Sequence, residues 1–195
     1  MAEPDVQDVV LLRDGTWLEV RPIRPADAGA LVAMHGRLSG DTIYRRYFGA
    51  RPHLAPADVD RFTRVDGRVR FALVAVRGTD LVAVARYEGQ SGQGSAELAV
   101  VVDDAVQRHG VGRLMLGRLV DVAREAGLRE IVADVLAGNT AMRGLLRTLG
   151  LPQRAERDGG TVTVHIDLTA LDLSPDRRAR ARRHLARAAT TGAAP

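Results

Sequence analysis

The sequence predicts an α/β fold in which helices pack on a β-sheet, and three features carry that prediction. Short runs rich in β-branched residues alternate with segments whose apolar residues recur at helical spacing. A turn-forming Asp14-Gly15 pair separates two β-rich runs near the N-terminus. A loop with two glycines, Gly110 and Gly112, leads from one β-rich run into an arginine-bearing helix. The sequence has no internal repeat.

Length and composition fit one globular domain with short appendages. The chain has 195 residues, 46% of them hydrophobic, which is enough to bury a core. No uncharged apolar run reaches the roughly eighteen residues of a membrane span, and the N-terminal residues lack a basic head and an apolar signal core. We therefore expect a cytoplasmic protein without membrane contact. Cysteine is absent, which excludes disulfides, cysteine-based metal sites and a thiol-bound intermediate, and no metal is expected.

The net charge of +4 comes from a basic tail over residues 171–195. From Ser174 onward this tail has six arginines and one aspartate, a balance of +5, so the rest of the chain carries −1. The tail has almost no aromatic residues for base stacking. We expect non-specific phosphate contact at most, and no specific nucleic-acid partner.

The N-terminal part begins with a hairpin that is followed by three helices. Two β-rich runs surround the turn, so residues 1–16 are assigned to an N-terminal segment with the first hairpin strand, and the domain to residues 17–170. Arg24-Pro25 suits a helix start. Apolar spacing and start signals then predict helices over residues 28–38, 39–48 and 54–65.

The period then changes to that of strands. Three β-branched runs separated by glycine-containing turns predict a meander over residues 70–76, 80–89 and 95–102. The remaining elements alternate between helix and strand: a helix over 111–126 ended by Gly127, a strand over 129–136, a helix over 139–150 capped by Asn139, and a strand over 160–168.

The loop Gln107-Arg108-His109-Gly110-Val111-Gly112 is a candidate anion site. Its glycines lie at the start of a helix, where unpaired N–H groups and the helix dipole stabilise negative charge. Arg108 and Arg113 add positive charge, so a diphosphate is the natural occupant. An ordinary strand-to-helix turn with glycines for tight packing is the alternative. The dinucleotide fingerprint and the nucleotide-triphosphate loop are both absent.

Gln107, Gly110 and Gly112 match the pattern R/Q-x-x-G-x-G/A, which resembles the acetyl-CoA diphosphate loop of the GCN5-related N-acetyltransferase (GNAT) family. The order of the following strand and asparagine-capped helix is similar too. More narrowly, "LRDGTWLEVRPIRPADA", "RLSGDTIYRRYF" and "AELAVVV" resemble bacterial Pat-like protein lysine acetyltransferases. Only about sixteen residues precede the domain, so the cyclic-nucleotide module that often accompanies it is not expected.

The resemblance implies a GNAT fold: a central mixed, mostly antiparallel sheet of six to seven strands, flanked by four to five helices and opened by an N-terminal hairpin. It also implies direct acetyl transfer from acetyl-CoA to an amine. In Pat-like proteins that amine is a lysine of a protein such as an acyl-CoA synthetase.

Glu97 is the candidate general base for that transfer. A lysine with a pKa of about 10.4 is protonated near neutral pH, and a carboxylate can remove its proton. Glu97 lies ten residues before Gln107, where Pat-like proteins have their catalytic glutamate. The run after it shows no alternation, which predicts burial on both faces and a functional reason for the acid. A solvent-facing acid on a half-exposed strand is the alternative, and Glu88 is the second candidate base.

The resemblance also assigns the cofactor-binding residues. The backbone of Val100, Val101 and Val102 would pair with the pantetheine amides, and a neighbouring N–H would stabilise the reacting oxygen. The loop residues Gln107, Arg108, His109, Gly110, Val111, Gly112 and Arg113 would hold the diphosphate. Asn139 would contact the CoA arm besides capping its helix. Leu146 occupies the position at which many relatives have a tyrosine that protonates the leaving thiolate, so the thiolate would leave without that acid.

Three functions remain open from the residues alone. The acceptor is a protein lysine or a small amine, or the protein is a non-catalytic acyl-CoA sensor. Residues 37–70, rich in arginine and aromatics, are the candidate acceptor-binding segment. Asp103 and Asp104 are expected to end their strand as turn residues. The sequence does not set the oligomeric state.

Overall fold

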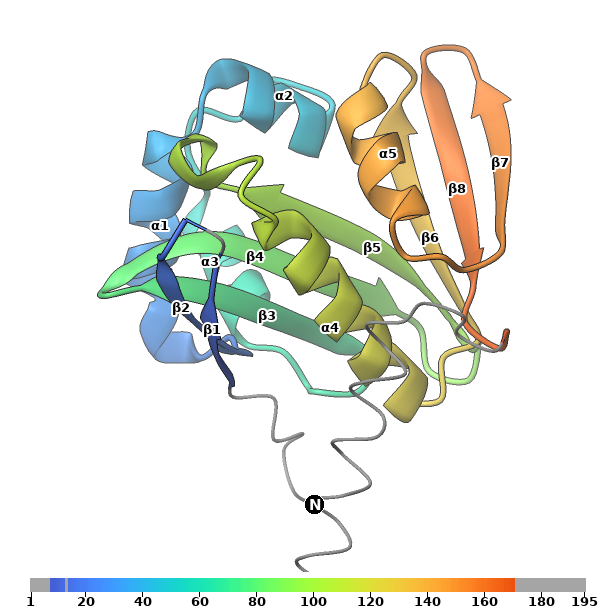
Figure 1. Cartoon of the computed structure of the whole chain (residues 1–195), viewed down its shortest axis with the longest axis horizontal. Helices are drawn as coiled ribbons and strands as arrows, with labels where there is room; N and C mark the ends of the chain where they lie inside the picture. The colour runs from blue at the N-terminus through green and yellow to red at the C-terminus, as the bar shows by residue number, and fades with distance from the viewer. Residues whose placement is uncertain (1–7, 13, 171–195) are drawn as a thin grey trace, which may run out of the picture.

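One eight-stranded sheet organises the protein (Figure 1). The computed structural model describes residues 8–12 and 14–170. The strand order is β1-β2-β3-β4-β5-β6-β8-β7, and every neighbouring pair is antiparallel except β5 and β6. The predicted mixed, mostly antiparallel sheet is therefore confirmed, with eight strands where six to seven were expected. The predicted tail over residues 171–195 lies outside the described residues.

The strands follow the predicted order with one addition. Their bounds are β1 Asp8–Leu11, β2 Trp17–Pro22, β3 Arg70–Arg77, β4 Asp80–Gly89, β5 Ser95–Val102, β6 Glu130–Leu136, β7 Gln153–Asp158 and β8 Thr161–Asp167. The additional strand is β7. Its sequence QRAERD is polar and almost wholly exposed, so it carries no apolar alternation, and its pairing with β8 makes it a strand.

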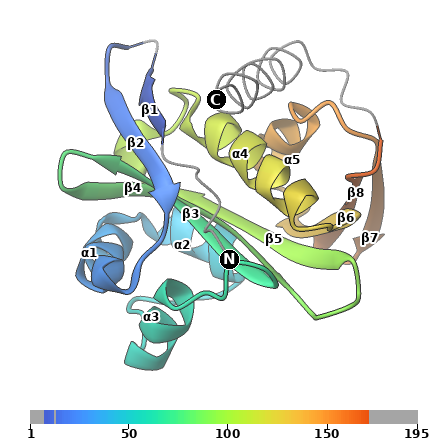
Figure 2. The same ribbon diagram turned by 90° about the horizontal axis from the view of Figure 1, so that it is seen from below.

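Five α-helices cover the two faces of the sheet within the described residues (Figure 2). On one face lie α1 Ala28–Arg37, α2 Gly40–Tyr47 and α3 Pro56–Thr63, and on the other lie α4 Val111–Glu125 and α5 Thr140–Arg147. Each face has its own hydrophobic core, the larger one beneath α4 and α5. In the part of the chain that is described, no helix is long and apolar enough to span a membrane.

The strand β5 separates the two cores, and its side chains alternate between them. Ala96 and Leu98 are buried in the larger core, whereas Val101 packs against the smaller one. Glu97 shares the α1–α3 face and is exposed. The prediction that this strand is buried on both faces is therefore wrong at Glu97, whose side chain faces solvent.

Tyr87 provides a test of how tightly the larger core is closed. Its side chain on β4 is fully buried, its ring stacks on Phe71 with centroids 5.8 Å apart, and its hydroxyl donates to the carbonyl of Arg68 at 3.2 Å. Burial raises the pKa of Tyr87 to about 12.

We predict that the free energy of unfolding falls as pH rises from about 10 to about 12, because the unfolded chain loses this proton first. The full effect is about 3 kcal/mol. Urea unfolding across this range should give a smaller pH slope for Tyr87→Phe than for the wild type. Equal slopes would contradict the burial of Tyr87.

Candidate active site

The site lies where two strands of the sheet separate. The parallel pairing of β5 with β6 covers only Ser95–Glu97 against Glu130–Val132. Beyond Glu97, β5 continues along β4 as far as Val102, while β6 continues along β8 (Figure 1). One edge of β5 from Leu98 to Val102 is thus not paired with β6. Such an edge offers backbone N–H and C=O groups to an extended ligand.

Glu97 occupies the point at which β5 and β6 separate. It is the last residue of β5 that pairs with β6, and it makes no hydrogen bond or ion pair within the described residues. Glu88, the second candidate, lies directly opposite on β4. Glu88 forms ion pairs with both Arg61 and Arg86, so its carboxylate serves the packing of β4 against α3. The structure thereby distinguishes two acids that sequence alone left as alternatives.

Arginines surround the two glutamates. Arg86 is only 5% exposed, and burial lowers its pKa to about 10 against the opposing effect of Glu88. Burial also lowers the pKa of Arg46 on α2, where the carboxylates of Glu97 and Glu88 act in the opposite direction. Arg46 is therefore close enough for the carboxylate of Glu97 to act on it. Sequence reasoning assigned arginines to the acceptor segment but missed Arg86, since a buried arginine inside an apolar strand looks like a strand residue.

The glycine loop has the geometry expected of an anion site. Gly110 precedes α4 with a φ of +87°, and no side chain caps the helix. A Cβ on Gly112 would lie 3.0 Å from a methyl group of Leu145 and 3.8 Å from one of Val102, so glycine lets the helix start approach β5 and α5. Arg108 also has a positive φ, of 66°. The side chain of Val111 is buried, so Val111 contributes to the loop through its backbone.

The residues on either side of the loop are held by hydrogen bonds. The Gln107 amide nitrogen donates to the carbonyl of Val102 and to the carboxylate of Asp104, both at 3.1 Å. His109 lies with its Nε2 3.9 Å from an oxygen of Asp14 in the β1–β2 turn, away from Glu97. The expectation that Asp103 and Asp104 only end the strand is incomplete, because both also bond to the α1–α2 region.

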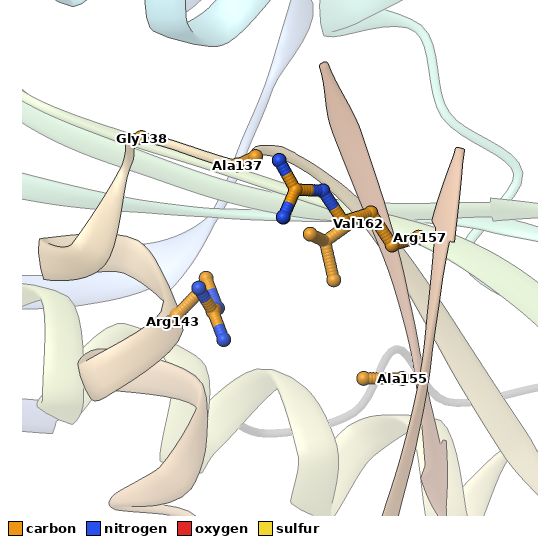
Figure 3. A pocket seen from close by; sticks show the side chains of 6 residues that line it. All are labelled: Ala137, Gly138, Arg143, Ala155, Arg157 and Val162. Atoms are coloured by element: carbon orange, nitrogen blue, oxygen red, sulfur yellow. The ribbon is translucent and has the colours of Figure 1, made fainter. Parts of the chain in front are cut away.

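The helix α5 presents Asn139 and Leu146 differently. Asn139 caps the helix, its side-chain oxygen accepting from the Met142 N–H at 3.1 Å, and its amide nitrogen makes no hydrogen bond within the described residues. Leu146 is fully buried in the larger core. A separate open groove of about 480 Å³ lies between α5 and the β7–β8 hairpin, lined by Ala137, Gly138, Arg143, Ala155, Arg157 and Val162 (Figure 3). It includes no residue predicted for the site.

Comparison with known proteins identifies the family to which the fold belongs. The family model described as acetyltransferase (GNAT) domain matches residues 18–152. An acetyltransferase of Pseudomonas aeruginosa is 31% identical over 158 residues, covering 79% of this chain and 85% of that protein. The acetyltransferase Pat of Mycolicibacterium smegmatis is 31% identical over 170 residues, covering 85% of this chain but 50% of the longer relative.

A solved structure agrees with these relatives. The GNAT domain of PAT from S. lividans superposes with a TM-score of 0.80 at 33% identity, covering 86% of this chain and 99% of that one. Fold and comparisons together define the protein as an N-acetyltransferase. More particularly, the chain belongs to the GCN5-related N-acetyltransferase family, whose domains use acetyl-CoA. The resemblance predicted from the sequence is confirmed.

The loop conformation gives a stability prediction. Gly110→Ala is expected to lower the free energy of unfolding by about 1–2 kcal/mol, because an L side chain is strained at this positive φ. Gly36→Ala is the matched control: it lies inside α1 with open space around the added Cβ, and should stabilise by up to about 1 kcal/mol. Urea denaturation measures both. A Gly110→Ala protein as stable as the wild type would contradict the left-handed conformation.

Proposed function

We propose that the protein acetylates lysine side chains of cytoplasmic proteins, such as acyl-CoA synthetases, by direct transfer from acetyl-CoA with Glu97 as general base. One observation carries the proposal: the exposed carboxylate of Glu97, which forms no hydrogen bond or ion pair within the described residues, lies where β5 and β6 separate. The open edge of β5 runs from that carboxylate toward the glycine loop. The proposed base, the unpaired strand edge and the candidate anion site thus follow one another along a single stretch of chain.

The fit of acetyl-CoA rests on the shape and polarity of that stretch. The uncapped N-terminus of α4 and the missing side chains of Gly110 and Gly112 leave room for a diphosphate close to the backbone. Arg108 and Arg113 bring positive charge to it. The unpaired edge at Val100, Val101 and Val102 suits the two amides of pantetheine, as an added strand would. The unbonded amide nitrogen of Asn139 is a further donor for the CoA arm.

The proposed reaction removes two protons from the acceptor nitrogen and releases the thiolate of CoA as the leaving group. Glu97 takes a proton from the acceptor ammonium, whose deprotonation costs about 4–5 kcal/mol near neutral pH. The neutral amine attacks the thioester carbon, the new C–N bond forms, the C–S bond breaks, and the nitrogen then loses a second proton to water to become the amide. A backbone N–H near Val100 stabilises the oxygen during the attack. Because Leu146 is buried and apolar, the departing thiolate takes its proton from water.

A protein acceptor is favoured over a small amine by the surface of α2. Tyr44 lies on this helix and Phe48 directly follows its last residue, and the two are 52% and 43% exposed. Exposed aromatic side chains are typical of protein-binding surfaces. The carboxylate of Glu97 acts electrostatically on Arg46 of the same helix, so a protein that contacts Tyr44 and Phe48 would bring a lysine close to the proposed base. The sequence resemblance to Pat-like protein lysine acetyltransferases supports the same choice.

Removing the proposed base should strongly slow acetyl transfer without weakening the binding of acetyl-CoA. Glu97→Gln is expected to lower kcat/KM by about 100-fold to 10,000-fold, the range for loss of a general base. Glu88→Gln, which alters the other acid of the pair, should retain most of the activity. The measurement is transfer of labelled acetyl groups to a purified acyl-CoA synthetase, to lysate proteins and to a panel of small amines.

The outcomes of this assay separate the candidate functions. Label on protein lysines that disappears in Glu97→Gln supports the proposal. Label confined to small amines would replace the protein acceptor by a small one. Thermal stabilisation by CoA without turnover on any acceptor would instead favour an acyl-CoA sensor. A larger loss of activity in Glu88→Gln than in Glu97→Gln would assign the role of general base to Glu88.

The diphosphate loop gives an independent prediction. Gly112→Ala should raise the KM for acetyl-CoA severalfold while leaving kcat at saturation largely unchanged, because the added Cβ pushes against Leu145 and shifts the loop. Gly36→Ala serves again as the control. An unchanged KM for acetyl-CoA in Gly112→Ala would argue against a cofactor site at this helix start.

A further inference from the structure

The carboxylate of Asp104 connects two segments that are far apart in the sequence. Its two oxygens accept hydrogen bonds from the Ser39 N–H at 2.8 Å, the Ser39 hydroxyl at 3.1 Å, the Thr42 hydroxyl at 2.7 Å and the Gln107 amide at 3.1 Å. Ser39 and Thr42 form the first turn of α2, and Gln107 opens the glycine loop. One exposed side chain therefore joins the start of α2 to the loop.

Hydrogen bonding to the carboxylate is strong enough to alter its ionisation. Burial alone would raise the pKa of Asp104, but the bonds from Ser39 and Thr42 outweigh it and lower the pKa below its ordinary value. The carboxylate is therefore ionised at neutral pH, and its bonds are charge-assisted. Such bonds are about twice as strong as those between neutral groups.

The helix α2 depends on such bonds because its packing is weak. It is eight residues long, and its side chains, Arg46 included, are at most partly buried. A helix this short is marginal without tertiary support. Its N-terminus is held by Asp104, and Asp103 holds the preceding segment through Arg37, whose Nε donates to Asp103 at 2.9 Å. The two acids that end β5 thus fix the position of α2.

The same helix carries Arg46, on which the carboxylate of Glu97 acts electrostatically. We propose that Asp104 is a positioning residue that couples the acetyl-CoA loop to the acceptor side of the site. An occupant of the loop fixes Gln107, Gln107 holds Asp104, and Asp104 holds α2, the helix that carries Arg46. This inference rests on the proposed cofactor site and base. It adds that acetyl-CoA binding orders α2 and thereby prepares the acceptor surface.

Coupling of this kind is reciprocal. If CoA binding stabilises α2, then loss of the bonds between α2 and Asp104 weakens CoA binding by the same factor. Loss of a charge-assisted bond network corresponds to a change of about tenfold or more. Asp104 is an exposed residue, so its removal leaves both hydrophobic cores unchanged.

Hydrogen–deuterium exchange of the full chain with and without CoA tests the proposal. In the wild type, CoA should slow exchange over residues 107–113 and, by about tenfold, over α2. In Asp104→Ala, CoA should slow exchange over 107–113 but no longer over α2, and the Kd for CoA should rise. Thr42→Val should act in the same direction.

The matched control is Asp41→Ala. Asp41 is also an acid in the first turn of α2, but its side chain is 85% exposed, and among the described residues it pairs only with Arg45 on its own helix, at 3.5 Å. It should keep the protection of α2 by CoA. Equal protection of α2 in Asp104→Ala and in the wild type would overturn the coupling and leave the cofactor site intact. No protection of residues 107–113 in the wild type would overturn the cofactor site, and the coupling with it.

Discussion

Everything at this site depends on an incomplete strand pairing. The backbone of a strand has hydrogen-bonding groups on both edges, and each needs a partner. On β5, β4 satisfies one edge along its length, whereas β6 satisfies the other only as far as Glu97. The rest of that edge is left for a ligand. Because β6, β8, β7 and α5 diverge from β5 together, the gap is a property of the whole sheet and not of one loop (Figure 1).

The chemistry of the gap between β5 and β6 depends on which of the nearby carboxylates already form ion pairs. Arg61 and Arg86 engage Glu88, so that acid contributes to packing. Glu97, one strand away on the same face, forms no such ion pair within residues 8–12 and 14–170. The difference between these two glutamates lies in their neighbours on α3 and β4, not in their residue type. On the other side of the gap, glycines at the start of α4 expose backbone dipoles that suit a diphosphate.

Local patterns predicted most of the fold, and long-range contacts account for what they missed. The hairpin around Asp14-Gly15 and the helix α4 carry strong local signals of turn and periodicity, and both are confirmed. Polar β7 is a strand only because β8 pairs with it. The exposure of Glu97 depends on where helices of another segment end, and the bonds of Asp104 join residues more than sixty positions apart. Neither feature can be predicted from the residues nearby in the sequence.

A structure of the protein bound to CoA tests the central claim most directly. The account predicts the pantetheine arm in the gap between β5 and β6, hydrogen-bonded to the backbone of Val100–Val102, with the diphosphate at the N–H groups that follow Gly110 and the thiol near Glu97. A CoA molecule bound elsewhere, such as in the groove between α5 and the β7–β8 hairpin, or a thiol far from Glu97, would contradict it.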